Sequence, residues 1–129
     1  MGDGDLAWRT GYWDRSNPHN IDAASSVSHK LQVTSVTRTS EFDKWLRGVA
    51  DVRVRAKVLA RADRLSLGNP GDVAPVGEGV SEMRIHYGPG YRVYYKQDGD
   101  VATLLWGGDK STQVADIEKA KRIASELED

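Results

Sequence analysis

Two kinds of hydrophobic spacing follow one another in the chain after residue 30. In the stretch 31–37 (LQVTSVT) apolar and polar residues alternate, which predicts a short strand. From Thr39 or Ser40 onward the apolar spacing changes to three and four, which predicts two consecutive helices. Asp51 is expected to cap the second helix, and LGNPG at 67–71 ends it. The residues expected on the buried faces of the two helices are Phe42, Trp45, Leu46, Val49, Val54, Val58, Ala62 and Leu65.

The stretch 80–107 predicts three consecutive antiparallel strands. GPG at 88–90 and DG at 98–99 supply the turns between them. The last of the three, VATLLWG at 101–107, is a nearly continuous apolar run, as in a strand covered on both faces. The preceding stretch 71–80 contains several glycines and a proline and predicts a loop. The first of these strands is expected to carry Val80, Met83, Ile85 and Tyr87 on one face, and Glu82, Arg84 and His86 on the other.

A last helix is predicted after the glycine pair at 107–108, with Ser111 or Thr112 as its cap. Its inward residues are expected to be Val114, Ile117, Ala120, Ala124 and Leu127. The resulting order, β-α-α-β-β-β-α, predicts an α+β domain at 31–129 with a mostly antiparallel sheet. Residues 1–30 show no sustained period and are expected to form a disordered or loosely attached extension, or a non-native start ahead of the domain.

Composition narrows the class of protein without identifying it. A chain of 129 residues fits one domain with one core. It has no cysteine, which excludes disulfides, zinc–thiolate sites and a cysteine nucleophile. No apolar run reaches the length of a membrane helix and no signal peptide is evident, so we expect a cytoplasmic protein. The net charge of −1 does not by itself indicate a nucleic-acid partner, although basic residues exceed acidic ones between Arg38 and Arg64.

Side chains able to handle a phosphate gather in the stretch 82–113. They are Arg84, His86, Tyr91, Arg92, Lys110, Ser111, Thr112 and Gln113. Arginine can clamp a phosphate through two parallel hydrogen bonds, and histidine is the usual acid–base group near neutral pH. GGDKST lacks the spacing of a nucleotide-binding loop, and no acidic residues cluster with histidine at metal-ligand spacing. We therefore predict no metal and no cofactor.

Four stretches together resemble the RelE/ParE superfamily of toxin–antitoxin toxins, specifically the HigB-like addiction-module killer proteins. They are EFDKWL (41–46), RADRLSLGNPGD (61–72), VGEGVSEMRIHYGPGYRVYY (76–95) and GGDKSTQ with DIEKAK (107–121). The resemblance covers residues 31–129. It implies a small toxin that cleaves mRNA, usually on the ribosome, and a cognate antitoxin that neutralises it. In HigB-type pairs the antitoxin, HigA-like, usually has a helix-turn-helix domain.

The resemblance also implies roles for residues of the motif. Arg92 matches an arginine that relatives place against the scissile phosphate, and Lys110 matches a second basic position. We assign Arg84 to phosphate contact, with an ion pair to Glu82 or Asp109 as the structural alternative. His86 is the catalytic acid–base candidate within the motif. Tyr94, Ser111, Thr112 and Gln113 complete the expected RNA contacts, with helix capping as the alternative for the two hydroxyls.

The start of the last helix departs from the family pattern. Some ribonucleases of this superfamily carry a tyrosine or histidine acid–base there, whereas this chain reads DKSTQVAD at 109–116. Asp116 and the hydroxyl groups occupy that region, and Tyr91 is a further acid–base candidate, although it shares a strand face with Val93 and Tyr95. The identity of the group that moves the protons stays open.

Three functions therefore remain in competition. The first is a metal-independent endoribonuclease acting on translating mRNA. The second is a non-enzymatic inhibitor of DNA gyrase, as in ParE-like relatives, and the third is an inactive protein that still binds an antitoxin. Expected antitoxin contacts are the apolar faces of the first two helices, with Trp45, and of the last helix, with core packing as the alternative.

Overall fold

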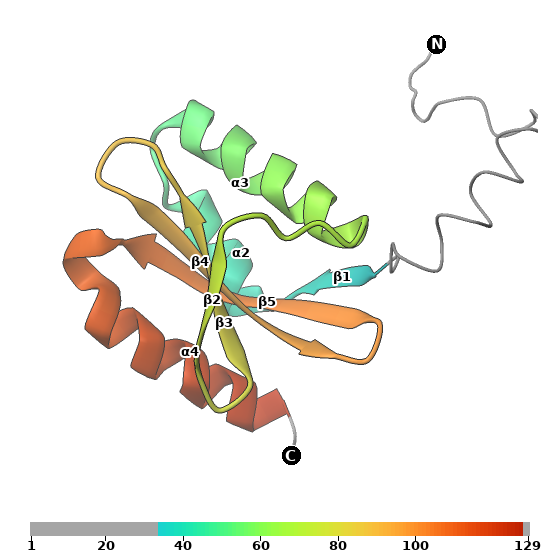
Figure 1. Cartoon of the computed structure of the whole chain (residues 1–129). Helices are drawn as coiled ribbons and strands as arrows, with labels where there is room; N and C mark the ends of the chain where they lie inside the picture. Colours follow the sequence, from blue (N-terminus) through green and yellow to red (C-terminus); the bar gives the residue numbers. More distant parts are fainter. Residues whose placement is uncertain (1–33, 128–129) are drawn as a thin grey trace, which may run out of the picture. The chain divides into compact units, whose positions relative to one another are not determined.

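The computed structural model describes residues 34–127 (Figure 1). The predictions for the extension at 1–30 and for a first strand beginning at Leu31 lie outside the described residues. The elements, in chain order, are β1 (Ser35–Arg38), α2 (Ser40–Arg47), α3 (Val52–Ser66), β2 (Val73–Gly77), β3 (Val80–Ile85), β4 (Tyr91–Asp98), β5 (Val101–Asp109), the 3-10 turn η1 (Lys110–Thr112) and α4 (Gln113–Leu127).

The five strands form one sheet in the order β1-β5-β4-β3-β2. β1 pairs in parallel with β5, and the three other pairs are antiparallel. Helices α2 and α3 cover one face of the sheet and α4 covers the other, as Figure 1 shows. The prediction of an α+β domain with a mostly antiparallel sheet is confirmed.

Side-chain caps begin the two predicted N-terminal helices. The Thr39 hydroxyl accepts a hydrogen bond from the Phe42 N–H at 3.0 Å, and an Asp51 carboxylate oxygen accepts one from the Arg53 N–H at 2.8 Å. The residues predicted to face inward are buried or half-buried in the core between these helices and the sheet. Both helices therefore follow the pattern of caps and apolar spacing.

The prediction of a loop at 71–80 is wrong, because residues Val73–Gly77 form the edge strand β2. Proline has no N–H for a ladder, and an edge strand tolerates it because one side has no neighbour. The pairing with β3 is also irregular between Pro75 and Gly77. In a strand this short and irregular, apolar and polar residues do not alternate clearly, so the sequence does not predict it as a strand.

The sheet separates two cores, and Val80 lies in a different one from that predicted. Met83 and Ile85 pack under α2 and α3, whereas Val80 packs with Tyr94 and Leu105 on the α4 side. Alternation explains the correction, because Glu82 lies two positions after Val80 and shares its face, whereas Met83 lies three positions after it and faces the other way. The prediction for β5 is confirmed, since this strand contributes to both cores.

The start and the ends of α4 differ from the prediction. The Asp109 carboxylate, not Ser111 or Thr112, accepts a backbone N–H at the start of η1. Val114 is 79% exposed and Leu127 is also exposed, whereas Ile123 is buried with Ala120 and Ala124. The buried stripe is therefore confined to the middle of the helix.

Candidate functional site

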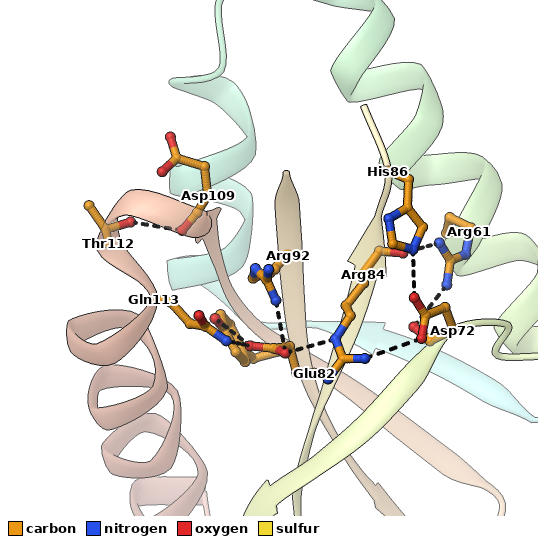
Figure 2. Close-up of polar contacts among 10 residues, drawn as sticks. Arg61, Asp72, Glu82, Arg84, His86, Arg92, Asp109, Thr112 and Gln113 are labelled. Carbon is orange, nitrogen blue, oxygen red and sulfur yellow. Dashed lines mark hydrogen bonds and ion pairs between the residues drawn. The ribbon is translucent and has the colours of Figure 1, made fainter. Parts of the chain in front are cut away.

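A buried glutamate organises the polar residues on the α4 side of the sheet. Glu82 is 1% exposed, although it carries a carboxylate. One of its oxygens, Oε1, accepts hydrogen bonds from Arg84 Nε at 3.3 Å and from Arg92 Nη1 at 3.1 Å. The other, Oε2, accepts from Gln113 Nε2 at 2.8 Å and from the Tyr94 hydroxyl at 3.2 Å. Figure 2 shows Glu82 between the two arginines and Gln113.

Strand register explains why these side chains meet. Glu82 on β3 lies directly opposite Tyr94 on β4, and Arg84 lies directly opposite Arg92. Directly opposed residues on one sheet face have Cβ atoms about 5 Å apart, within reach of one carboxylate. Gln113 is the first residue of α4, so its bond to Glu82 also links that helix to the sheet.

The hydrogen bonds keep Glu82 ionised. Burial alone raises the pKa of this carboxyl group, but the hydrogen bonds from Gln113 and Arg84 and the charge of Arg92 outweigh burial and lower the pKa below its ordinary value. Burial of the Tyr94 hydroxyl, together with the charge of Glu82, raises the pKa of Tyr94. Tyr94 is 0% exposed, so its ring offers no surface on which a base could stack.

A second acid, Asp72, extends the network to His86. Asp72 Oδ2 lies 2.6 Å from His86 Nε2, and Oδ1 accepts a hydrogen bond from Arg84 Nη1 at 3.4 Å. The hydrogen bond with His86 lowers the pKa of Asp72, and the charge of Arg84 acts in the same direction. Arg84 therefore joins the two acids, and the contacts run without interruption from His86 to Gln113 (Figure 2).

Arg61 of α3 fixes the segment that carries Asp72. Its guanidinium donates to the backbone carbonyls of Arg84 and Pro70, the latter at 2.9 Å. A pocket of about 290 Å³ lies beside these residues. The pocket lining is Lys57, Ala60, Arg61, Arg64, Ile85 and His86. The edge of the site near His86 is thus predominantly basic.

The residues of η1 form a separate group. The side chain of Lys110 is exposed and makes no hydrogen bond or ion pair within residues 34–127. The Ser111 backbone N–H and hydroxyl both donate to the Asp109 carboxylate. Thr112 donates to Asp116, which also accepts from the Trp106 indole N–H at 2.9 Å. Among the described residues, none of these side chains forms a hydrogen bond or ion pair with Glu82, Arg84 or Arg92.

The glycine pair that precedes η1 has a packing role. A Cβ at Gly107 would lie 2.4 Å from the Trp45 ring, and a Cβ at Gly108 would lie 1.8 Å from an Asp116 carboxylate oxygen. Both approaches are far closer than real Cβ contacts. The pair therefore lets Trp45 pack against one face of β5 and lets Asp116 reach the other.

The predicted residues thus fall into three positions. Arg84, Arg92, His86, Tyr94 and Gln113 belong to the Glu82–Asp72 network, and Lys110, Ser111, Thr112 and Asp116 lie at the start of α4. Tyr91 packs against the core on the α2–α3 side of the sheet.

Sequence reasoning missed the organising role of the two acids. The sequence pattern predicts Glu82 only as an ion-pair partner of Arg84, and it predicts no role for Asp72. The signal in the sequence is Glu82 itself, an acidic residue in the middle of a strand whose other residues are expected to be buried or basic.

The described residues contain no group of three or more histidine, aspartate or glutamate side chains that could hold a metal ion, and no helix among them is long and apolar enough to cross a bilayer.

Solved structures define the class of fold. The toxin–antitoxin complex RelBE2 of Mycobacterium tuberculosis contains a chain similar to this one with a TM-score of 0.51 and 20% sequence identity, over 60% of this chain and 92% of that one. A mutant of E. coli toxin RelE in the free state is similar with a TM-score of 0.55 and 18% identity, over 70% and 98%. The domain therefore has the fold of the RelE toxins.

A closer relative exists at the level of sequence. A protein of Haemophilus influenzae, described only as uncharacterized, is 50% identical over 93 residues, which are 71% of this chain and 94% of the relative. The chain belongs to the same family as this H. influenzae protein. No family model matches the sequence.

Proposed function

We propose that the protein is a HigB-like toxin of a type II toxin–antitoxin system, and that it cleaves mRNA on the translating ribosome in the cytoplasm without a metal. One observation carries the proposal: two arginines lie side by side on the sheet of a RelE-type fold, held by one buried carboxylate. The likeness to RelE toxins supplies the class of reaction, and the arginine pair supplies a place for its charged intermediate.

The phosphate chemistry needs positive charge fixed in advance. When the 2′-hydroxyl oxygen attacks phosphorus, negative charge grows on the phosphoryl oxygens until the bond to the 5′-oxygen breaks. Donors already oriented toward that charge lower the barrier because they need no reorganisation during the reaction. We assign this role to Arg84 and Arg92, both half-buried and both oriented by Glu82.

His86, paired with Asp72, is the proposed acid–base group. An aspartate bonded to one imidazole nitrogen orients the ring and leaves the other nitrogen to exchange a proton with substrate. His86 is 77% exposed, so RNA can reach it. Tyr94 is unsuited to this step because its hydroxyl is buried and bonded to Glu82, and Tyr91 because it packs on the opposite side of the sheet.

The residues of η1 receive a supporting role in the proposal. Lys110 is an exposed cation without a partner within residues 34–127, and it follows the strand next to that of Arg92. We assign it to a neighbouring RNA phosphate, together with Ser111 and Thr112. Gln113 and Asp116 act indirectly, because their side chains are engaged with Glu82 and with Trp106.

An antitoxin partner is proposed on the same basis. The M. tuberculosis structure contains a toxin bound to its antitoxin. We expect a HigA-like helix-turn-helix antitoxin to cover exposed apolar residues of the helices. These are Val52 and Leu59 on α3 and Val114 and Leu127 on α4. The inner faces of the helices cannot serve, since they form the core.

A reconstituted translation reaction tests the function. Purified protein is added to ribosomes translating a defined mRNA, and primer extension maps new 5′ ends. The proposal requires new ends that depend on the protein and that form at least about 100-fold more slowly with the Arg92→Ala variant. Supercoiling by purified DNA gyrase is measured in parallel. Gyrase inhibition without RNA cleavage would replace the proposal with the ParE-like alternative.

A further inference from the structure

The arrangement of Arg84 and Arg92 is unfavourable by itself. Like charges directly opposite each other in an antiparallel pair destabilise a sheet. The two guanidinium groups share one face, yet the single carboxylate of Glu82 lies between them and bonds to both. Glu82 therefore makes possible a pair of cations that the sheet would otherwise disfavour.

Stability alone does not account for a carboxylate at this position. Removing a carboxylate from water is unfavourable, and an apolar residue of similar volume often stabilises a protein equally well or better. The neighbours Val80, Tyr94 and Leu105 already form an apolar core beside it. An apolar side chain at position 82 would extend that core, but it would leave Arg92 without its carboxylate and Arg84 with Asp72 alone.

Glu82 also leaves part of each arginine unused. It takes Nε of Arg84 and Nη1 of Arg92, one nitrogen from each. Within residues 34–127, Arg92 Nε is buried and has no hydrogen-bond partner, and the side chain of Arg84 is 38% exposed. A buried donor without a partner requires an explanation, and an anionic ligand that contacts the guanidinium would supply one.

We propose that Glu82 is a positioning residue that holds Arg84 and Arg92 at one shared site for a single phosphate group. The inference rests on the proposed function for the identity of that phosphate, which is the scissile group of RNA. The carboxylate fixes one side of each guanidinium, and the N–H groups that neither Glu82 nor Asp72 takes bind the phosphate. Gln113 and Tyr94 satisfy the second carboxylate oxygen and so keep Glu82 from turning away from the arginines.

Three variants of the full chain test the role in catalysis. Glu82→Gln keeps the shape but removes the charge, Glu82→Asp keeps the charge but withdraws it by one methylene, and Glu118→Gln removes an exposed charge on α4 as the matched control. For Glu82→Gln we expect kcat for RNA cleavage to fall about 100-fold, as when one transition-state donor is lost, with KM changed less than about threefold. Glu82→Asp is expected to fall between Glu82→Gln and wild type, and the control to match wild type.

A measurement on the arginines is independent of RNA cleavage. ¹H–¹⁵N spectra resolve the Nε–H groups of Arg84 and Arg92, and inorganic phosphate serves as the probe. In wild type we expect phosphate to shift both signals along a single saturation curve. In Glu82→Gln we expect broadened signals and at least tenfold weaker phosphate binding. This readout is retained if the protein does not cleave RNA, so it separates failure of the inference from failure of the proposed function.

Two results would overturn the inference. One is a folded Glu82→Gln protein with the kcat and arginine spectra of wild type. The other is wild-type protein in which phosphate shifts only one of the two arginine signals, or neither. The second result needs no variant, so the inference is tested even if Glu82→Gln and Glu82→Asp both fail to fold.

Discussion

Two polar groups on this domain contain the same kinds of residue but are built differently. In the first, Glu82 is buried and receives hydrogen bonds from side chains on two strands and a helix. In the second, the Asp109 carboxylate is near the surface and, within residues 34–127, bonds only to the turn that follows it. The first holds distant parts of the chain at a fixed position, whereas the second starts a helix. Burial of the acid, rather than the presence of basic residues, distinguishes the candidate site.

The largest expected effect is the loss of RNA cleavage when Arg92 of the first group is replaced. In Arg92→Ala we expect RNA cleavage to fall about 10²- to 10³-fold, the usual cost of losing one preorganised donor to the transition state. Arg122→Ala, which removes an exposed arginine of α4, is the matched control and should cleave as wild type does. Rates are measured on variants with wild-type circular dichroism spectra. A folded Arg92→Ala protein within threefold of wild type would contradict the assignment.

Substitution in the second group should change the stability of the domain. A methyl group at position 108 would collide with Asp116, which also anchors Trp106. We expect Gly108→Ala to lower the free energy of unfolding by about 1–3 kcal/mol, the usual cost of overpacking. Gly48→Ala is the control, because Gly48 has a helical backbone and a Cβ there meets nothing closer than 3.4 Å. Urea denaturation measures both, and equal stability of the two variants would refute the packing role.

The charge of Glu82 should also be visible in the pH dependence of the free energy of unfolding. Since the folded-state pKa of Glu82 lies below its unfolded value of 4.5, its ionised form contributes stability above that pH, and the contribution is lost as pH falls through the folded value. We expect the free energy of unfolding of Glu82→Gln to fall less steeply below pH 4.5 than that of wild type. Asp72 and Asp109, whose pKa values are also lowered, account for the slope that remains. Parallel slopes in the two proteins would contradict a charged Glu82.

Lys110 should give the smallest effect. It is solvated and lies outside the Glu82 network, so Lys110→Ala is expected to lower cleavage by only about threefold to tenfold and to leave unfolding unchanged. The loss should diminish at high salt, because a solvated charge is screened. A loss as large as that of Arg92→Ala, independent of salt, would move the centre of the site to η1.

Local pattern predicted most of the fold, because caps and apolar spacing act within a few residues. Asp51 caps the helix that follows it, and Phe42 is buried at the position that the apolar spacing predicts. The sequence did not predict β2, because it is a short edge strand interrupted by Pro75.

The candidate site was predicted only in part, because its organisation depends on register between strands. Nothing in the sequence places Glu82 beside Arg92 ten residues later, or Asp72 beside His86 fourteen residues later. The basic residues were recognised by their type, but the acids that arrange them could be identified only in the folded chain.

The most direct test is a structure of the wild-type protein bound to a short RNA with 2′-O-methyl groups, which cannot be cleaved. The account predicts a phosphate between Arg84 and Arg92, within about 3 Å of a nitrogen of each, as in charge-assisted hydrogen bonds. The 2′-oxygen next to that phosphate should face His86. A phosphate bound instead at Lys110 and the N–H groups of η1, with both arginines free of RNA, would contradict it.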